Sequence, residues 1–357
     1  MPLRFLGLFQ VPFLLFDISK IKVMKKIFIG VDVSKLKLDF CNYQDGVFDK
    51  EEIIANHSLA IKRHLIDILS DIAKDSLLIC AEYTGKYIYP LTCVCDELGI
   101  DLWIENPVQI KYRSGMQRGK NDKLDARKIA TYACRFEDQA HLFSMPEKSI
   151  QSLKQLVRER DMLVCDRAKY KGQLTDQRDF MDQLLFKRKQ KRLLQLIANL
   201  NKVILQLEEE IQSIVDNDPT LSKQHHLLCS IDGVGKRTSL KMIIETNAFQ
   251  DFKDPRKFCC HAGVAPFSYT SGSSVRSKRK VSHRADKSIK SLLHMAALSA
   301  SKTSGELGQY YCRKVAEGKN KMTVLNAIRA KLVLRMFAVI KKEKEYLQNY
   351  INPLSVS

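Results

Sequence analysis

The fold of this chain is decided by the stretch KIFIGVDVSK, residues 26–35. Aliphatic side chains occupy every second position in it, at Ile27, Ile29, Val31 and Val33. An alternation with a period of two is typical of a β-strand that buries one face. Asp32 lies on the face opposite the aliphatic row, near the end of the predicted strand.

The segments that follow complete an α/β pattern. In chain order we expect a strand over 36–43, a third strand after the turn Gln44-Asp45-Gly46, an amphipathic helix over 57–73, a buried strand over 77–80, a helix over 87–98 and a strand over 101–104. The order β-β-β-α-β-α-β, followed by another helix, predicts an α/β domain with a mixed sheet over residues 26–148.

Three more acidic residues stand at distinctive places in this domain. Glu82 comes directly after the buried strand, where a carboxylate is costly unless it faces a cleft or has a partner. Asp122 and Asp125 are three residues apart in a segment with helical character, so they share one face. Basic residues surround this pair, at Lys120, Lys123, Arg127 and Lys128. The segment therefore indicates a cation site that faces a polyanion.

The overall charge also favours a nucleic-acid partner. The 357 residues include 59 Lys and Arg against 40 Asp and Glu, which gives a formal net charge of +19. Such an excess can neutralise phosphates and release their counterions. Ten cysteines without a Cys-x-x-Cys pair favour reduced thiols in a cytosolic protein over a zinc site or a disulfide framework. No stretch is apolar enough to cross a membrane.

Residues 1–25 form an unusual leader. The apolar run at 6–16 contains Pro12 and is too short to span a bilayer. Because a clear strand begins directly afterwards, we expect the leader to be disordered, or Met24 to be the natural start.

From residue 149 the sequence changes to long, charged segments of helical character, which predict a helical arm over residues 149–218. Apolar side chains in its second half follow steps of four and three, at Leu193, Ile197, Leu200, Ile204, Leu207, Ile211 and Ile214. In the first half Arg160 and Arg167 occupy positions of the seam. The pattern indicates either an antiparallel or intermolecular coiled coil, or a helical hairpin packed within one chain.

A mainly α-helical domain is expected over residues 219–345, with a tail over 346–357. It begins with Gly233 and Gly235 between two short helices, which is either a phosphate-binding helix-hairpin-helix or a plain turn. The sequences AGVAP at 262–266 and TSGSS at 270–274 then precede a basic run and a helix over 288–301. The basic residues of this run are Arg276, Lys278, Arg279, Lys280, Arg284, Lys287 and Lys290.

Three motifs, GVDVSK at 30–35, AEYTG at 81–85 and KNDKLDA at 120–126, resemble those of a RuvC-like domain with the ribonuclease-H fold. More narrowly, the chain resembles the DEDD transposases of bacterial insertion sequences, which are bridge-RNA-guided recombinases. This resemblance implies that Asp32, Glu82, Asp122 and Asp125 form a catalytic acidic tetrad. Four acids in one place repel each other unless divalent cations hold them, and an oxygen-only site that also accepts phosphate suits Mg²⁺.

The second half resembles the C-terminal serine transposase domain of the same family. The likeness implies that Ser271 is the nucleophile, although Ser273 and Ser274 lie in the same short loop and leave its register open. It also implies that the acidic tetrad of a partner protomer lies beside the serine. We expect nucleic acid to be bound by Lys120, Lys123, Arg127, Arg276, Lys278, Arg279, Lys280, Arg284 and Lys287.

The resulting hypothesis is a Mg²⁺-dependent transposase that forms a phosphoserine link to DNA and is directed by a guide RNA. Its expected partners are DNA, the guide RNA and further copies of itself, as a dimer or tetramer joined by the arm, in the bacterial cytoplasm and at the nucleoid. Two alternatives remain at this point. One is a structure-selective endonuclease of the junction-resolvase kind, and the other is an inactive nucleic-acid-binding relic.

Overall fold

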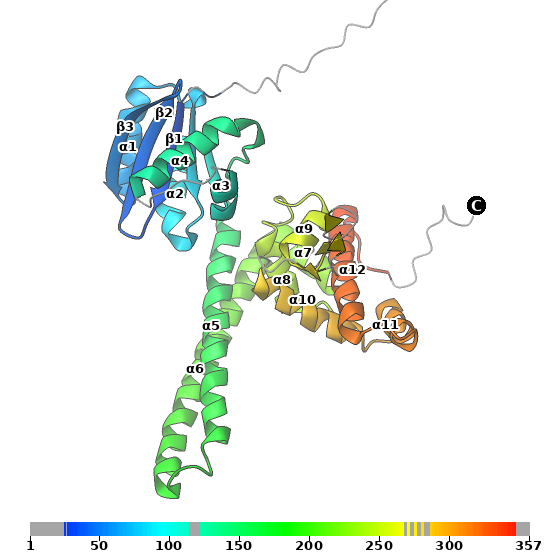
Figure 1. Cartoon of the computed structure of the whole chain (residues 1–357). Helices are drawn as coiled ribbons and strands as arrows, with labels where there is room; N and C mark the ends of the chain where they lie inside the picture. Colours follow the sequence, from blue (N-terminus) through cyan, green and yellow to red (C-terminus); the bar gives the residue numbers. More distant parts are fainter. Residues whose placement is uncertain are drawn as a thin grey trace, which may run out of the picture. The chain divides into compact units, whose positions relative to one another are not determined.

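The computed structural model describes residues 25, 27–113, 122–267, 270–271, 275–276, 280–281 and 286–347. The chain divides into two compact units, Met1–Met145 and Pro146–Ser357 (Figure 1). The rest of the expected leader lies outside the described residues, but Lys25 is bound to the first unit, where its ammonium lies 2.6 Å from a carboxylate oxygen of Asp101. Residues 348–357 of the expected tail also lie outside the described residues.

The first unit is built on one mixed five-stranded sheet with the order β3-β2-β1-β4-β5. Its strands are β1 (Ile27–Val33), β2 (Lys37–Gln44), β3 (Val47–Ala55), β4 (Leu77–Glu82) and β5 (Leu102–Glu105). Strands β1, β2 and β3 are antiparallel, while β4 and β5 continue the sheet in parallel with β1. The predicted element order and the mixed sheet are therefore confirmed.

Helices cover both faces of this sheet. They are α1 (Ser58–Asp71), α2 (Tyr89–Leu98), α3 (Pro107–Arg113) and α4 (Asp122–Arg135). The aliphatic row of β1 packs with buried residues of α1 and α2, such as Leu65 and Leu91. Phe28, on the other face of β1, packs with α4 through Ile129 and Tyr132. This two-sided burial confirms the alternation read from residues 27–33, and it places α4 on the same face of the sheet as Asp32.

The second unit begins with a long helical hairpin, α5 (Lys148–Asp176) and α6 (Gln183–Asn217), which we call the helical arm (Figure 1). Five residues of the expected seam are buried, namely Leu193, Ile197, Ile204, Leu207 and Ile211. The Arg160 Nε donates to Glu208 at 2.8 Å, and an Arg167 terminal nitrogen donates to Asn201 at 2.9 Å. The two arginines therefore meet polar partners on the antiparallel helix. The arm is a hairpin within one chain; its role in joining chains stays a prediction.

The rest of the second unit is mainly helical, as predicted. It contains α7 (Pro219–Cys229), α8 (Lys236–Glu245), α9 (Pro255–His261), α10 (Lys287–Ala300), α11 (Glu306–Ala316) and α12 (Lys321–Lys342). Its core includes Phe258, Leu293 and Ile328, and it extends to Leu153 and Val215 at the base of the arm. The base of the arm and these helices thus share one core.

Four two-residue strands lie between α9 and α10. They are β6 (Pro266–Phe267), β7 (Thr270–Ser271), β8 (Val275–Arg276) and β9 (Lys280–Val281). Strand β6 pairs with β9 and β7 pairs with β8, both antiparallel, so the backbone forms a nested hairpin. We call these four strands the serine hairpin. None of the described helices is long and apolar enough to span a lipid bilayer.

Candidate functional site

Carboxylates from three elements lie near the carboxyl-terminal ends of β1 and β4, which are neighbouring strands in the middle of the five-stranded sheet. Asp32 stands on β1, Glu82 ends β4, and Asp122 and Asp125 lie in the first turn of α4. The parallel register aligns Val31 with Ala81, which brings the positions of Asp32 and Glu82 side by side. The charges of Glu82, Asp122 and Asp125 all act on Asp32, while only Asp122 of the three brings an oxygen atom within 4.8 Å of Asp32 in a cluster that could hold a metal ion.

The pKa of Asp32 reports how close these groups are. The pKa of Asp32 is raised from its ordinary value of 3.8 to about 6, first by burial and then by the negative charges of Asp122, Asp125, Glu82 and Asp39, in that order. A carboxylate in such surroundings binds a proton easily unless a cation offsets the repulsion.

Asp39 is the member of the site that the sequence analysis missed. It stands on β2 directly opposite Asp32 in the antiparallel ladder, and it is only 3% exposed. One oxygen atom from each of Asp32, Asp39 and Asp122 lies within 4.8 Å of the other two. The tight turn between β1 and β2 could have revealed this pairing. Ser34 N donates to Lys37 O at 3.0 Å, so Ser34 lies opposite Lys37. Two residues further from the turn on each strand, Asp32 lies opposite Asp39.

A lysine lies between two of these acids. The Lys37 ammonium is 3.0 Å from Asp39 Oδ2 and 2.9 Å from Asp122 Oδ2. Hydrogen bonds to Asp122 and then to Asp39 raise the pKa of Lys37. On α4, the Lys128 ammonium lies 2.6 Å from Asp125 Oδ1. Like charges opposed across strands are unfavourable, and these ammonium groups offset that repulsion.

Gly30 determines how closely α4 approaches the sheet. A β-carbon at this position would overlap the carbonyl oxygen of Ala126 and the backbone nitrogen of Ala130. Ala126 and Ala130 are themselves small and buried. Because only a hydrogen atom separates β1 from α4 here, the first turn of α4 can place Asp122 beside Asp32.

The predicted DNA-binding residues of the first unit are not all free for DNA. Arg127 forms an ion pair with Glu51 of β3, and its guanidinium lies 5.2 Å from the centre of the Phe48 ring. Lys123 lines a cavity of about 310 Å³ together with Asp39 and Glu51. Lys120 lies outside the described residues.

The serine hairpin places the backbone of Ser271 at the end of β7, paired with Val275. Residues 272–274, which include Ser273 and Ser274, lie outside the described residues, as do Lys278, Arg279 and Arg284. Arg276 and Lys280 are described by their backbone alone, on β8 and β9. Lys287 begins α10 and is exposed.

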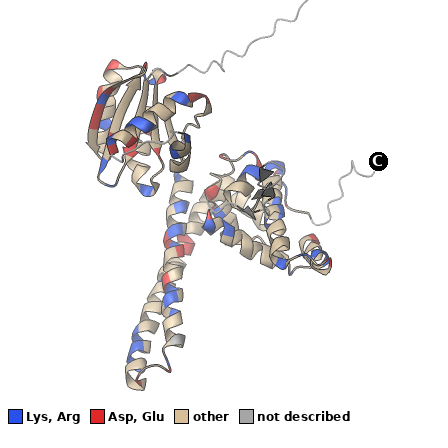
Figure 2. Ribbon diagram, in the orientation of Figure 1, with Lys and Arg blue, Asp and Glu red and all other residues tan. Residues whose placement is uncertain are grey.

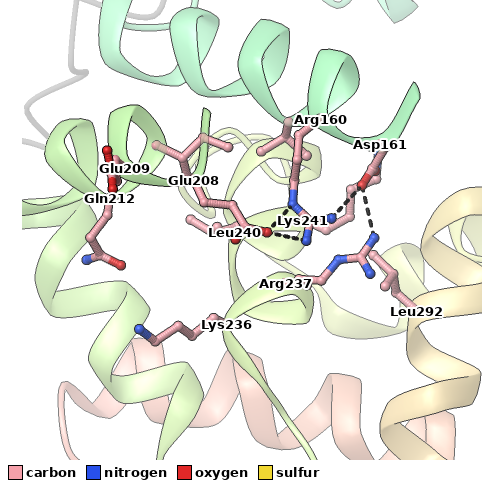
Figure 3. Close-up of a pocket in the computed structure, with 12 residues that line it drawn as sticks. Arg160, Asp161, Glu208, Glu209, Gln212, Lys236, Arg237, Leu240, Lys241 and Leu292 are labelled. Carbon is pink, nitrogen blue, oxygen red and sulfur yellow. Dashed lines mark hydrogen bonds and ion pairs between the residues drawn. The ribbon is translucent and has the colours of Figure 1, made fainter. Parts of the chain in front are cut away.

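The glycine turn between α7 and α8 has a packing role. Gly233 has a φ of +86°, and a β-carbon there would lie 2.6 Å from the carbonyl oxygen of Ala296 on α10. Beside this turn, α5, α6, α8 and α10 enclose a groove of about 500 Å³ (Figure 3). Arg160 pairs with Glu208 within it, and Arg237 lies 3.0 Å from Asp161. These ion pairs balance much of the charge in the groove.

The cysteines show no metal site among the described residues. All ten are free thiols. His225 Nδ1 lies 2.9 Å from Ser239 Oγ, and its Nε2 lies 3.9 Å from Cys229 Sγ. This hydrogen-bonded group ties α7 to α8.

Comparisons with known proteins agree on the class of the chain. Residues 29–184 match the transposase model for the DEDD domain of IS110 elements, and residues 225–312 match the model of the transposase IS116/IS110/IS902 family. The chain is 24% identical over 330 residues to the pilin gene-inverting protein of Moraxella lacunata, covering 90% of this chain and 98% of the relative. It is also 24% identical over 336 residues to the pilin gene-inverting protein of Moraxella bovis, with the same coverage.

Among solved structures, the chain is similar to RuvC of Thermus thermophilus. The structure in complex with a Holliday junction substrate has a TM-score of 0.27 and 11% identity, and it covers 33% of this chain and 99% of RuvC. RuvC alone has a TM-score of 0.26 and 12% identity over the same shares.

Proposed function

We propose that this chain, a DNA transposase that carries two transposase domains, cuts and rejoins DNA through a covalent link to Ser271. Its curated relatives are named for inverting a gene. A protein that rearranges DNA must rejoin the strands that it cuts. A covalent protein–DNA link conserves the energy of the broken bond, whereas hydrolysis loses it.

The proposed step is a transesterification at phosphorus. The Ser271 oxygen bonds to the phosphorus of a DNA phosphodiester, and the bond from phosphorus to one deoxyribose oxygen breaks. The serine hydroxyl loses its proton, and the leaving oxygen gains one. In the reverse step, the hydroxyl of a second DNA strand displaces the serine and restores a phosphodiester.

The observation that carries the proposal is the gathering of acids around Asp32. Carboxylates from β1, β4 and α4 meet at one sheet edge, and their charges act on a single group. An oxygen-only site of this kind suits Mg²⁺, and Asp32, Glu82, Asp122 and Asp125 would hold it with Asp39 beside them. When bound, Mg²⁺ would supply Lewis-acid polarisation of phosphate oxygens.

We assign the choice of DNA sites to a guide RNA, and the association of chains to the helical arm. The net charge of +19 supports contacts to nucleic-acid backbones, and Lys and Arg occur along the arm as well as on both units (Figure 2). Such contacts position a nucleic acid without reading its sequence, so base pairing to RNA would select the site. We place this activity in the bacterial cytoplasm, at the nucleoid.

A suicide DNA substrate tests the proposal. The substrate traps the cut intermediate, and denaturing electrophoresis shows whether protein migrates with labelled DNA. We expect an Mg²⁺-dependent adduct with the wild type and with Ser273→Ala and Ser274→Ala, but none with Ser271→Ala. An adduct that survives Ser271→Ala would refute the assignment of the serine. Cleavage without any adduct would favour a junction resolvase in which the acidic site activates water.

RNA association has its own test. RNA that co-purifies with the chain is sequenced and then removed with ribonuclease. We expect one enriched transcript, whose removal abolishes the choice of DNA site while leaving backbone binding in place. Unaltered site choice after complete removal would contradict guidance by RNA.

A further inference from the structure

Arg329 of α12 is the only buried lysine or arginine among the residues that the structure describes, with 6% of its surface exposed. A buried charge is normally paired with an opposite charge, because removal from water is costly. Across the described ranges, no carboxylate lies within ion-pair distance of the Arg329 guanidinium. The charge therefore needs another explanation.

The described partners of Arg329 are neutral. One terminal nitrogen donates to His294 Nδ1 of α10 at 2.6 Å, and the other donates to Asn326 Oδ1 at 3.4 Å. The Nε is buried without a hydrogen-bond partner. A guanidinium carries five N–H donors, so most of its donors remain available within the described part of the chain.

His294 adds a further donor and no negative charge. Arginine has no acceptor, so His294 Nδ1 must accept the hydrogen bond and the ring proton must lie on Nε2. Burial lowers the pKa of His294, and the positive charge of Arg329 lowers it further. The ring is therefore neutral near pH 7.

A chain of hydrogen bonds joins Arg329 to the root of the serine hairpin. Asn326 accepts from Arg329 through its side-chain oxygen, and its nitrogen donates to the carbonyl of Val264 at 2.8 Å. Val264 lies two residues before β6. The face of α12 that carries Arg329 therefore adjoins the backbone that leads into the hairpin.

The neighbouring sequence supplies no negative charge. Residues 266–285 contain Arg276, Lys278, Arg279, Lys280 and Arg284 and no Asp or Glu. The next acid, Asp286, caps α10 by accepting from Ser288 N at 2.7 Å and Ile289 N at 3.0 Å. Among the described residues and within the segment 266–285, no carboxylate therefore supplies a counter-charge to Arg329, which favours the negative charge of a bound ligand.

We propose that Arg329, oriented by His294 and Asn326, binds a phosphodiester group of DNA at the root of the serine hairpin. A guanidinium suits this group because its fork of donors matches two phosphate oxygens. This inference rests on the proposed function in one respect: the proposed function identifies the bound phosphodiester as part of the DNA that the chain cuts and rejoins. Arg329 is a phosphate-binding and positioning residue for the strand presented to Ser271.

The test measures DNA affinity against salt concentration in a Ser271→Ala background, with the full-length chain and duplex DNA of the element's ends. Loss of one phosphate contact reduces the slope of log K against log salt by about 0.9. We expect this reduction in Arg329→Met, together with a thermal midpoint equal to or above that of the parent, because an uncompensated buried charge has been removed. Arg329→Lys should largely restore the slope.

Arg335→Met is the matched control. Arg335 lies on the same helix but is paired with Glu306, so its loss should leave the salt slope unchanged. A lower midpoint with an unchanged slope in Arg329→Met would show a structural role and overturn the proposal. If Arg329→Met does not fold, the salt slope of Arg329→Gln is measured in its place.

The kind of nucleic acid is tested separately. A slope change seen only with single-stranded RNA of equal length would overturn the assignment to DNA. Because Ser271 is already absent, failure of the serine mechanism does not alter any of these results.

Discussion

Asp32 and Asp39 face each other as directly opposed residues of the β1–β2 ladder, at the edge of the sheet where α4 begins. Two carboxylates in this arrangement repel each other, and Asp39 is almost completely buried. The Lys37 ammonium, within 3.0 Å of Asp39 and 2.9 Å of Asp122, offsets part of that repulsion. In the metal-free protein the Lys37 ammonium supplies positive charge to these acids, and under the proposed function a divalent cation would take over this role.

Replacing Lys37 tests this exchange. We expect Lys37→Met to unfold at a lower temperature than the wild type without divalent cations, because two acids lose their ammonium partner. Mg²⁺ should then stabilise the variant more than it stabilises the wild type. Thermal unfolding with and without Mg²⁺ measures both effects, and Lys35→Met, at an exposed neighbouring position, is the control. An equal response to Mg²⁺ in all three proteins would contradict the role of Lys37.

The raised pKa of Asp32 predicts a pH dependence. The folded pKa is about 6 against an ordinary value of 3.8, so the folded metal-free protein binds the proton more tightly than the unfolded chain. The stabilisation that this group contributes is therefore lost as the pH rises from about 4 to about 6, by about 3 kcal/mol at most. Asp32→Asn should remove this loss, as denaturant unfolding at a series of pH values would show.

The affinity for Mg²⁺ should depend on the same ionisation of Asp32, but it should increase with pH over the range in which the stability of the metal-free protein decreases. Since the cation needs the charged carboxylate, affinity should rise with pH up to about 6 and then level off. Calorimetric titration at pH 5, 6 and 7 measures this directly. A flat profile between pH 5 and pH 7 would mean that Asp32 does not hold the metal.

Gly30 is predicted to be intolerant of a side chain. A β-carbon would overlap backbone atoms of Ala126 and Ala130, and backbone cannot give way as a flexible side chain can. We expect Gly30→Ala to cost about 3 kcal/mol or more of folding free energy, and to weaken Mg²⁺ binding because α4 is displaced. Gly235→Ala, which meets open space at an ordinary φ of −90°, should change both by little. Wild-type stability in Gly30→Ala would show that α4 is less tightly packed.

The seam of the arm offers a prediction on stability alone. Ile204 is 4% exposed, whereas the adjacent Leu205 is 57% exposed. We expect Ile204→Ala to cost about 2 to 4 kcal/mol and Leu205→Ala to cost close to nothing. Denaturant unfolding followed by circular dichroism distinguishes them. If Leu205→Ala proved as costly as Ile204→Ala, then Leu205 must be buried by another chain in solution.

The sequence by itself determined the order of elements and the mixed sheet, and it selected four of the five acids of the candidate site. Alternation in residues 27–33 and the apolar run at 77–80 reflect burial, which local patterns record well. Asp32, Glu82, Asp122 and Asp125 could be selected because each stands at the end of an element or in a recognisable motif. Burial of the arm's seam was predictable for the same reason, since it follows helical periodicity.

Tertiary structure alone decided which charges meet. Asp39 joined the site through the register of a turn, and Arg127 was directed to Glu51 by the position of β3 against α4. Neither relation appears as a periodic pattern in the chain. The antiparallel contact of α5 with α6 likewise depends on pairs such as Arg160 with Glu208, 48 residues apart, while the association of arms from different chains stays a prediction. Charges act through space over a few ångströms, and sequence distance says little about which of them become neighbours.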